Sequence, residues 1–313
     1  MRILIIGAGA TGGSYGARLI EAGRQVTFLV RQPRVEMLAR GGLTLDAPDG
    51  RRTLQVRAVT AIEPGDHYDL VIAAVKAPAL DAVLRTAAPA IGPETMILPV
   101  LNGMEHLDVL QAAYPGQVLG GLIKIVATLD ESGAILQMTP MSTMTIGTLD
   151  GSPLRDEIRE ALSVPGIDLS VDGDVVTRLW EKWAFIAAAG VITCLFRGNI
   201  GDILTAGGED HILQAIAEAE EVARAAGHPA SEESHAQSLG LLTEPGSSFT
   251  SSLYRDLQLG DPAESEHILG RLAARARNLQ VDTPLLDAAL LQMRTHQAAR
   301  KRTKQATREV ASA

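Results

Sequence analysis

A glycine-rich loop near the start of the chain is the first candidate for chemistry. An apolar run at residues 2–7 ends at Gly7, and Gly9 and Gly12 come next. A helix-like stretch then follows and closes at Gly23. In such a loop the first glycine allows a tight turn, the second lets a pyrophosphate approach the backbone, and the third lets helix and strand pack closely. The free N–H groups at the helix N-terminus favour anions. The predicted dinucleotide site is formed by Gly7, Ala8, Gly9, Ala10, Thr11 and Gly12.

The end of the second expected strand, residues 25–30, indicates which dinucleotide binds. Arg31 follows this strand, at the place where an NAD site usually carries a carboxylate. The planar guanidinium can bind a 2′-phosphate through two parallel hydrogen bonds. NADP is therefore the predicted cofactor, and a solvated loop cation is the alternative interpretation of Arg31.

Two polar residues stand at the ends of the next two expected strands. Lys76 follows the strand at 69–75, and Asn102 follows the strand at 95–101. Open α/β sheets bind ligands at the carboxyl ends of their strands, so both side chains are candidates for the site. The Asn102-Gly103 pair can equally be a simple turn.

The order of elements predicts the fold that would position these residues. Strands and helices alternate through the first part of the chain, with a helix expected at 78–90, which favours a doubly wound parallel sheet of the Rossmann type. Three short strands are expected to add antiparallel pairs at the edge of that sheet. They lie at 123–128, 134–139 and 144–148, with turns at 131–133 and at Pro140.

From about Thr177 onward the apolar residues recur at helical spacing. Helices separated by glycine and proline are expected at 177–196, 209–226, 231–242, 247–258, 262–279 and 283–300. The predicted architecture is an α/β NADP-binding domain at 1–168 and an all-helical substrate domain at 169–313, joined near 165–176.

The whole chain resembles the ketopantoate reductase family. The motifs that carry the resemblance are Gly7-x-Gly9-x-x-Gly12, Arg31, Val75-Lys76, Leu101-Asn102-Gly103-Met104, Leu179-Trp180-x-Lys182, Ser251-Ser252-x-x-x-Asp256 and Glu264. The resemblance implies reduction of a 2-oxo acid by NADPH, by default ketopantoate to pantoate in pantothenate biosynthesis. It further implies that Lys182 is the general acid and that Ser252 and Glu264 bind the substrate. Asn102 would lie between cofactor and substrate.

A lysine suits this chemistry independently of the resemblance. Hydride attack on a ketone develops alkoxide charge, so a cation that also donates a proton stabilises the transition state. Partial desolvation lowers the pKa of a lysine towards the working pH, and Lys182 opens the most apolar stretch of the chain, 183–196. The alternative is a surface cation that lies beside Trp180 and Trp183.

The two expected substrate-binding residues also have simpler explanations. Glu264 stands three residues after Asp261, with Pro262 between them, which is the pattern of a capping box at a helix start. Ser252 can be an ordinary polar residue of a helix.

The chain departs from the family at three positions where the family has asparagine. Ile186 and Gly190 stand four and eight residues after Lys182 on the same helix face, and Phe249 stands three residues before Ser252. Loss of these amides makes the site more apolar and weakens recognition of a hydroxyl. Two further hypotheses follow: a reductase of a different, more apolar 2-oxo acid, and a non-catalytic NADP(H)-binding sensor.

Composition limits the other classes of function. The 313 residues carry 28 Lys+Arg against 37 Asp+Glu, a net charge of −9, so the broad basic footprint of a nucleic-acid-binding protein is missing. The seven histidines and the single cysteine, Cys194, indicate neither a metal site nor a disulfide. The apolar run at 183–196 is short for a membrane span, and a cytoplasmic location is expected.

Expected partners are a small 2-oxo acid and, as an open alternative, a second copy in a homodimer. Only five residues are lysines, and no role is predicted for Lys124.

Overall fold

The apolar run before the glycine loop forms β1, Arg2–Ile6, at the centre of a five-stranded sheet in this computed structural model. The strand order is β5-β2-β1-β6-β7 and all pairs are parallel. The other strands are β2 Gln25–Leu29, β5 Arg57–Val59, β6 Leu70–Ala73 and β7 Met96–Pro99. The predicted doubly wound sheet is confirmed, and its strand order reverses between β1 and β6.

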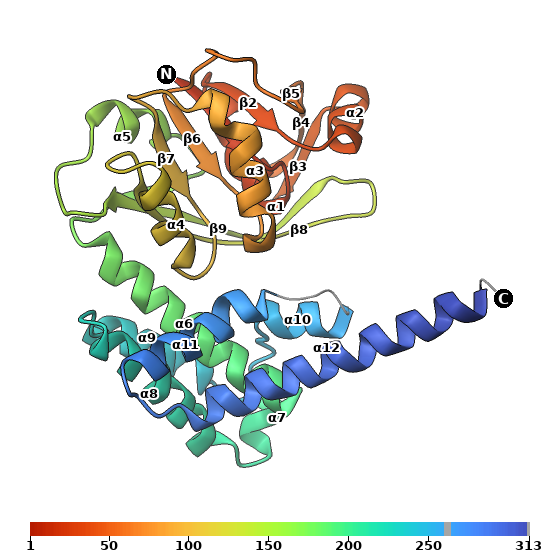
Figure 1. Cartoon of the computed structure of the whole chain (residues 1–313), viewed down its shortest axis with the longest axis vertical. Helices are drawn as coiled ribbons and strands as arrows, with labels where there is room; N and C mark the ends of the chain where they lie inside the picture. Colours follow the sequence, from red (N-terminus) through yellow and green to blue (C-terminus); the bar gives the residue numbers. More distant parts are fainter. Residues whose placement is uncertain (260–263, 312–313) are drawn as a thin grey trace. The chain divides into compact units, whose positions relative to one another are not determined.

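The structure describes residues 1–259 and 264–311, and the side chains of Asp81, Lys304 and 306–311 lie outside its description. Two compact units are formed, Met1–Leu179 and Trp180–Ala313 (Figure 1). The division falls within helix α6, Val175–Phe196, later in the chain than the predicted domain boundary between residues 168 and 169.

The two faces of β1 are buried against different layers of the first unit, because successive side chains of a strand point to opposite faces. Ile3 and Ile5 pack with helix α1, Ala10–Glu21, and with a second sheet beyond it. Leu4 and Ile6 pack with Ala87 and Ala90 on the other face. These last residues belong to the expected helix at 78–90, which forms two 3-10 turns, Ala77–Ala79 and Ala88–Ala90, around α3, Leu80–Ala87.

The second sheet has the order β10-β9-β3-β4, with β8 also paired to β9. Its strands are β3 Leu43–Ala47, β4 Gly50–Leu54, β8 Leu119–Leu129, β9 Ile135–Thr148 and β10 Asp168–Val171. The antiparallel pair β8–β9 is as predicted, and it belongs to this second sheet. A bridge between Ile97 of β7 and Val118 joins the start of β8 to the edge strand of the parallel sheet. The turn predicted at Pro140 is wrong: β9 runs through it, because the register shift between Ile125 and Ala127 accommodates the proline in a bulge.

Three short helices complete the first unit. They are α2 Gln32–Gly41, α4 Glu105–Ala113 and α5 Asp156–Leu162.

The second unit is helical, as predicted. Its helices after α6 are α7 Ile200–Thr205, α8 Glu209–Ala225, α9 Glu232–Leu242, α10 Ser252–Leu259, α11 Arg271–Asn278 and α12 Pro284–Ala311, with a π-helical turn at Glu266–Gly270. Helix α10 begins later than the predicted residue 247, because the Ser251 hydroxyl accepts the Tyr254 N–H (3.0 Å) and caps it. The start of the helix expected at 262–279 lies outside the described residues.

Helix α6 forms the core of the second unit. Its length and composition alone would suit a membrane span, but 72% of its most apolar window is buried within the structure. Trp183 and the alanines at 187–189 are each at most 1% exposed. Helix α6 is thus packed as the core helix of a globular domain.

Candidate active site

The glycine loop joins β1 to α1 with the backbone that the sequence predicts. Gly7 has a φ of 99°, a conformation that favours glycine, and its N–H donates to the Leu29 carbonyl (3.0 Å). A Cβ at Gly12 would strike the Gly7 carbonyl oxygen, whereas a Cβ at Gly9 would meet nothing within 4 Å. Gly12 is therefore required for packing, while Gly9 borders open space.

The N-terminus of α1 is open to an anion. Gly9 is its N-cap, and no side chain caps the first turn. The free N–H groups there belong to the residues around Ala10 and Thr11, which are half-buried, while Ala8 is buried. This end of the helix carries partial positive charge, so the loop fits the pyrophosphate of a dinucleotide.

Three more of the predicted residues follow strands of the parallel sheet. Arg31 follows β2 and is exposed, Lys76 follows β6 and is exposed, and Asn102 follows β7 and is half-buried. Because these strands are parallel, their carboxyl ends lie at the same edge of the sheet as the glycine loop. Gly103 has a φ of 78°, and the chain bends at the Asn102-Gly103 pair. A role of Asn102 beyond this bend stays a prediction.

Arg34, to which the sequence analysis gave no role, holds the glycine loop directly. Its Nε and Nη2 atoms donate to the Ala8 carbonyl (3.1 and 2.9 Å), and its Nη1 donates to the Gly133 carbonyl (2.9 Å). Desolvation by burial lowers the pKa of Arg34 below its ordinary value. The sequence could have suggested this role only through the position of Arg34, three residues after Arg31. The helix that carries it, α2, was not predicted.

In the second unit, Lys182 lies on α6 between two neighbours whose contacts are fixed. The buried Glu181 carboxylate accepts the Ser231 N–H (2.9 Å) and hydroxyl (2.6 Å). The buried Trp183 indole donates to the Ile268 carbonyl (3.0 Å). Because these contacts fix the rotation of α6 about its axis, Lys182 is held in a half-buried position.

The tryptophans beside Lys182 already have a cation. The Arg275 guanidinium lies over Trp180 (5.4 Å to the ring centroid) and Trp183 (5.9 Å), and His228 stacks on Trp180 (5.9 Å). This arrangement weighs against the interpretation of Lys182 as a cation that merely covers these rings.

Two of the positions that lack the family asparagine, Gly190 and Phe249, lie where α10 and the residues before it pack on α6. A Cβ at Gly190 would come within 2.7 Å of Leu253 Cδ1. The Phe249 ring lies 6.2 Å from the Phe185 ring, centroid to centroid. The glycine and the phenylalanine are therefore part of how these helices meet.

A polar contact of the same helices lies beside Ser252. The buried hydroxyls of Thr193 on α6 and Ser251 before α10 are 2.6 Å apart. Ser252, the first residue of α10, is exposed. The two adjacent serines thus differ: Ser251 joins and caps helices, and Ser252 is accessible to a ligand.

Glu264 is half-buried and lies just before the π-helical turn, where its carbonyl accepts the Ile268 N–H (2.8 Å). The same turn accepts the Trp183 indole N–H, so the segment that carries Glu264 is tied to α6 next to Lys182. Turns of this kind inside helices are frequent at functional sites. Asp261 and Pro262, the partners in the capping alternative, lie outside the described residues.

The remaining candidates from the sequence are assigned no role in the site. Burial raises the pKa of the Cys194 thiol to about 12, which suits an unreactive core residue. Among residues 1–259 and 264–311, no group of three or more His, Cys, Asp or Glu side chains is placed to hold a metal. Lys124 is exposed on β8, opposite Thr143 of β9.

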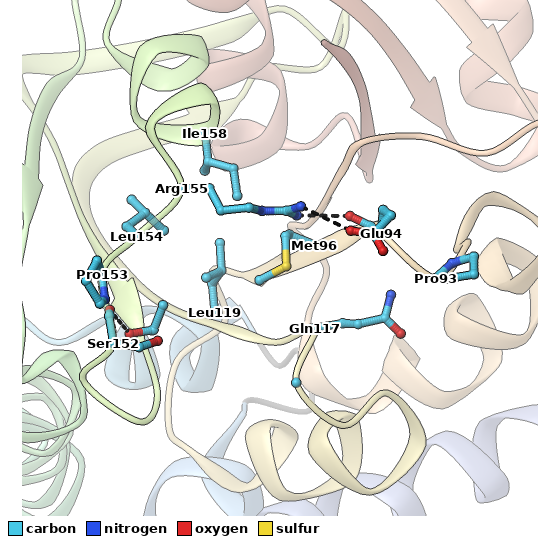
Figure 2. Close-up of a pocket in the computed structure, with 12 residues that line it drawn as sticks. Pro93, Glu94, Met96, Gln117, Leu119, Ser152, Pro153, Leu154, Arg155 and Ile158 are labelled. Atoms are coloured by element: carbon cyan, nitrogen blue, oxygen red, sulfur yellow. Dashed lines mark hydrogen bonds and ion pairs between the residues drawn. The ribbon is translucent and has the colours of Figure 1, made fainter.

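A pocket of about 290 Å³ in the first unit is lined by none of the predicted site residues. It includes Met96, the first residue of β7, so it lies towards the amino ends of the parallel strands. Figure 2 shows the Arg155 side chain directed at Glu94, whose carbonyl it contacts at 2.9 Å. The pocket therefore lies at the opposite edge of the parallel sheet from the glycine loop.

The sheet, the glycine loop and the helical second unit define an oxidoreductase that uses a nicotinamide cofactor. Residues 3–151 match the family described as "Ketopantoate reductase PanE/ApbA", and residues 174–297 match "Ketopantoate reductase PanE/ApbA C terminal". The chain belongs to the ketopantoate reductase family, whose members act on CH–OH groups and the corresponding carbonyls.

Two relatives are similar in sequence over nearly the whole chain. The chain is 35% identical to the "Uncharacterized oxidoreductase YkpB" of Bacillus subtilis (strain 168), with 95% of this chain and 99% of the relative covered. It is 26% identical to the 2-dehydropantoate 2-reductase of Archaeoglobus fulgidus, with 90% and 92% covered.

Solved structures share the fold over nearly the whole chain. The 2-dehydropantoate 2-reductase from Methylococcus capsulatus superposes with a TM-score of 0.81 at 25% identity, covering 94% of this chain and 96% of that one. A D-mandelate dehydrogenase with NADH and anilino(oxo)acetate gives 0.85 at 20% identity (96% and 99%). A dimeric ketopantoate reductase from Staphylococcus aureus gives 0.80 at 21% identity (96% and 99%).

Proposed function

We propose that the protein reduces a 2-oxo acid to a 2-hydroxy acid with NADPH and that Lys182 is the general acid. The observation that carries the proposal is the position of Lys182: half-buried on the apolar helix α6 and oriented by the fixed contacts of Glu181 and Trp183. A lysine held on an anchored helix beside apolar residues is suited to donating a proton to a carbonyl oxygen.

Lys182, Ser252 and Glu264 have different roles in the proposed reaction. The reduced nicotinamide, when bound, supplies a hydride to the carbonyl carbon. Lys182 holds its proton until negative charge develops on the carbonyl oxygen and then donates it from Nζ, which leaves a 2-hydroxy acid and a neutral amine. Ser252 offers an accessible hydroxyl to the substrate, and Glu264 offers a carboxylate to a substrate hydroxyl.

The default substrate is ketopantoate, which would place the reaction in pantothenate biosynthesis. A 2-oxo acid with a more apolar side chain is the second candidate, supported by the half-buried Phe185, Ile186 and Phe249 on the α6–α10 surface. Both ketopantoate reductases and a D-mandelate dehydrogenase share the fold, so the fold alone does not select between these substrates.

The experiment that tests the proposed function follows NADPH absorbance with a panel of 2-oxo acids, from ketopantoate to branched and aromatic ones. Turnover of at least one acid supports a reductase, and the order of kcat/KM values identifies the substrate class. Tight NADPH binding without turnover of any acid would instead favour the sensor hypothesis.

Replacing Ile186 by asparagine tests the apolar candidate. Ile186 stands one helical turn from Lys182 and is half-buried, so an amide there is accessible to a substrate hydroxyl. We expect the ratio of kcat/KM for ketopantoate over an apolar 2-oxo acid to rise about tenfold, the effect of one hydrogen bond to substrate. An unchanged ratio would show that residue 186 does not contact the substrate.

Replacing Arg31 by alanine tests the NADP assignment. Arg31 is exposed at the end of β2, where its guanidinium can reach a 2′-phosphate that NADH lacks. We expect KM for NADPH to rise about tenfold or more, the value of a charged hydrogen bond, while KM for NADH stays the same. An equal rise for both cofactors, or a wild-type preference for NADH, would contradict the assignment.

We also propose that the protein works in the cytoplasm as a homodimer. A dimeric ketopantoate reductase among the structural neighbours supports pairing. Measurement of the molar mass in solution by light scattering tests it, with a monomer at all concentrations as the contrary result.

A further inference from the structure

We propose that Arg34 is a positioning residue of the dinucleotide loop, which it ties to the tip of the β8–β9 hairpin. The inference rests on the proposed dinucleotide site and adds to it a residue whose effect is on loop geometry and not on the 2′-phosphate. Arg34 connects three segments that are far apart in sequence: its own helix α2, the loop at Ala8 and the hairpin turn at Gly133.

The contact with Ala8 fixes a peptide plane inside the glycine loop. Two N–H groups of Arg34, on Nε and Nη2, donate to the single carbonyl oxygen of Ala8. In a trans peptide the carbonyl and the following N–H point in opposite directions. Holding the Ala8 carbonyl towards Arg34 therefore directs the Gly9 N–H to the other side, next to the open space at Gly9.

The contact with Gly133 rests on a turn that several hydrogen bonds close. The Asp130 carboxylate accepts the Ser132 hydroxyl (2.7 Å) and the Ala134 N–H (2.9 Å), and the Gly133 N–H donates to the Asp130 carbonyl (3.0 Å). Gly133 has a φ of 82°, and a Cβ there would lie 2.6 Å from Arg34 Nη1. The turn thus presents a carbonyl to Arg34 and has room for it only because residue 133 is glycine.

These contacts use most of the hydrogen-bond donors of the Arg34 guanidinium. Arg34 has five N–H donors, and four of them donate to Ala8, Gly133 or the Met37 sulfur (2.9 Å): one on Nε, two on Nη1 and one on Nη2. The side chain is therefore occupied in shaping the loop. Discrimination between NADPH and NADH falls to Arg31, one turn earlier and exposed.

The test replaces Arg34 by methionine and measures the Kd of NADPH and of NADH by calorimetry. Methionine keeps the unbranched stem but donates no hydrogen bond, so the Ala8 carbonyl loses its partner. We expect both Kd values to rise about tenfold, with their ratio unchanged and kcat at saturating cofactor unchanged. Arg40→Met, an exposed arginine in the last turn of the same helix, is the matched control.

Two more variants separate geometry from charge and from folding. Arg34→Lys keeps the charge but has no rigid fork, so it should bind cofactor nearly as weakly as the methionine variant. Gly133→Ala keeps the arginine but displaces it, and should raise both Kd values as well. If Arg34→Met does not fold, as judged by its cofactor-free melting temperature, these two variants decide the question.

The outcomes distinguish the inference from the function on which it rests. A rise in the Kd of NADPH alone would make Arg34 a reader of the 2′-phosphate and overturn the positioning role, as would full rescue by lysine or no change in either Kd. A wild-type protein that prefers NADH would end the NADP assignment, while an NADH Kd raised by Arg34→Met would still support the positioning role.

Discussion

Replacement of Lys182 by alanine is expected to lower kcat for the best 2-oxo acid by about 10²–10⁴-fold, the usual contribution of a general acid. The alkoxide that forms on hydride attack would then have to take its proton from water, without a fixed cation to stabilise it. NADPH should bind as in the wild type, because Lys182 lies on α6 and the dinucleotide loop lies between β1 and α1. Single-turnover kinetics with bound NADPH measures the chemical step directly.

Controls make the result specific to the ammonium group. Lys182→Met preserves most of the side-chain volume, so an equal loss in both variants points to proton donation and not to a packing defect. Lys301→Ala, an exposed lysine of α12, should leave kcat unchanged. Full turnover by Lys182→Ala would end the assignment of the general acid.

The parts of the fold that depend on local sequence were predictable. Gly7 is required by a turn and Gly12 by a close contact with the Gly7 carbonyl oxygen, so the glycine spacing indicated the loop once the flanking strand and helix were recognised. The apolar run of β1 and the long apolar stretch of α6 were predictable because continuous apolar runs are typical of buried segments. Four of the five residues of β1 are buried, as is 72% of the most apolar window of α6.

The parts of the fold that depend on contacts between distant segments could not be predicted from the sequence. The β8–β9 pair was expected at the edge of the parallel sheet, where the Ile97–Val118 bridge does join it to β7. Its membership of a second sheet comes from the pairing of β9 with β3 and β10, which no local pattern indicated. Arg34 shows the same limit. Its partners Ala8 and Gly133 lie 26 and 99 residues away, and no pattern around Arg34 itself reveals them.

The family asparagines that this chain lacks show how packing and specificity are linked. At position 190 the glycine lets α10 approach α6, with Leu253 in the space that a side chain would need. A Gly190→Asn substitution therefore would not simply restore a family pocket, because Leu253 would have to move first. The sequence revealed the missing amides, and the structure adds that neighbouring apolar groups have taken their place.

Substitution of Gly9 by alanine is expected to weaken NADPH binding at least tenfold while the free energy of unfolding changes by less than about 1 kcal/mol. A Cβ at Gly9 meets nothing within 4 Å, and its φ of −79° and ψ of −166° are allowed for alanine. The free energy of unfolding should therefore change little, because alanine restricts the unfolded chain, worth about 0.4–1 kcal/mol, but is a poorer N-cap residue than glycine. The substitution lowers the affinity for NADPH because the new methyl group occupies space that the pyrophosphate needs.

Gly12→Ala is the matched comparison, because here the added Cβ would strike the Gly7 carbonyl oxygen and approach the Ala74 Cβ at 2.9 Å. We expect it to lower the free energy of unfolding by about 1–3 kcal/mol, the usual effect of overpacking, in addition to weakening NADPH binding. Urea denaturation of the cofactor-free variants measures the first quantity and calorimetric titration the second. If Gly9→Ala bound NADPH as tightly as the wild type, the pyrophosphate would not pass over Gly9. The open space there would then need another explanation, even though the loop keeps its geometry.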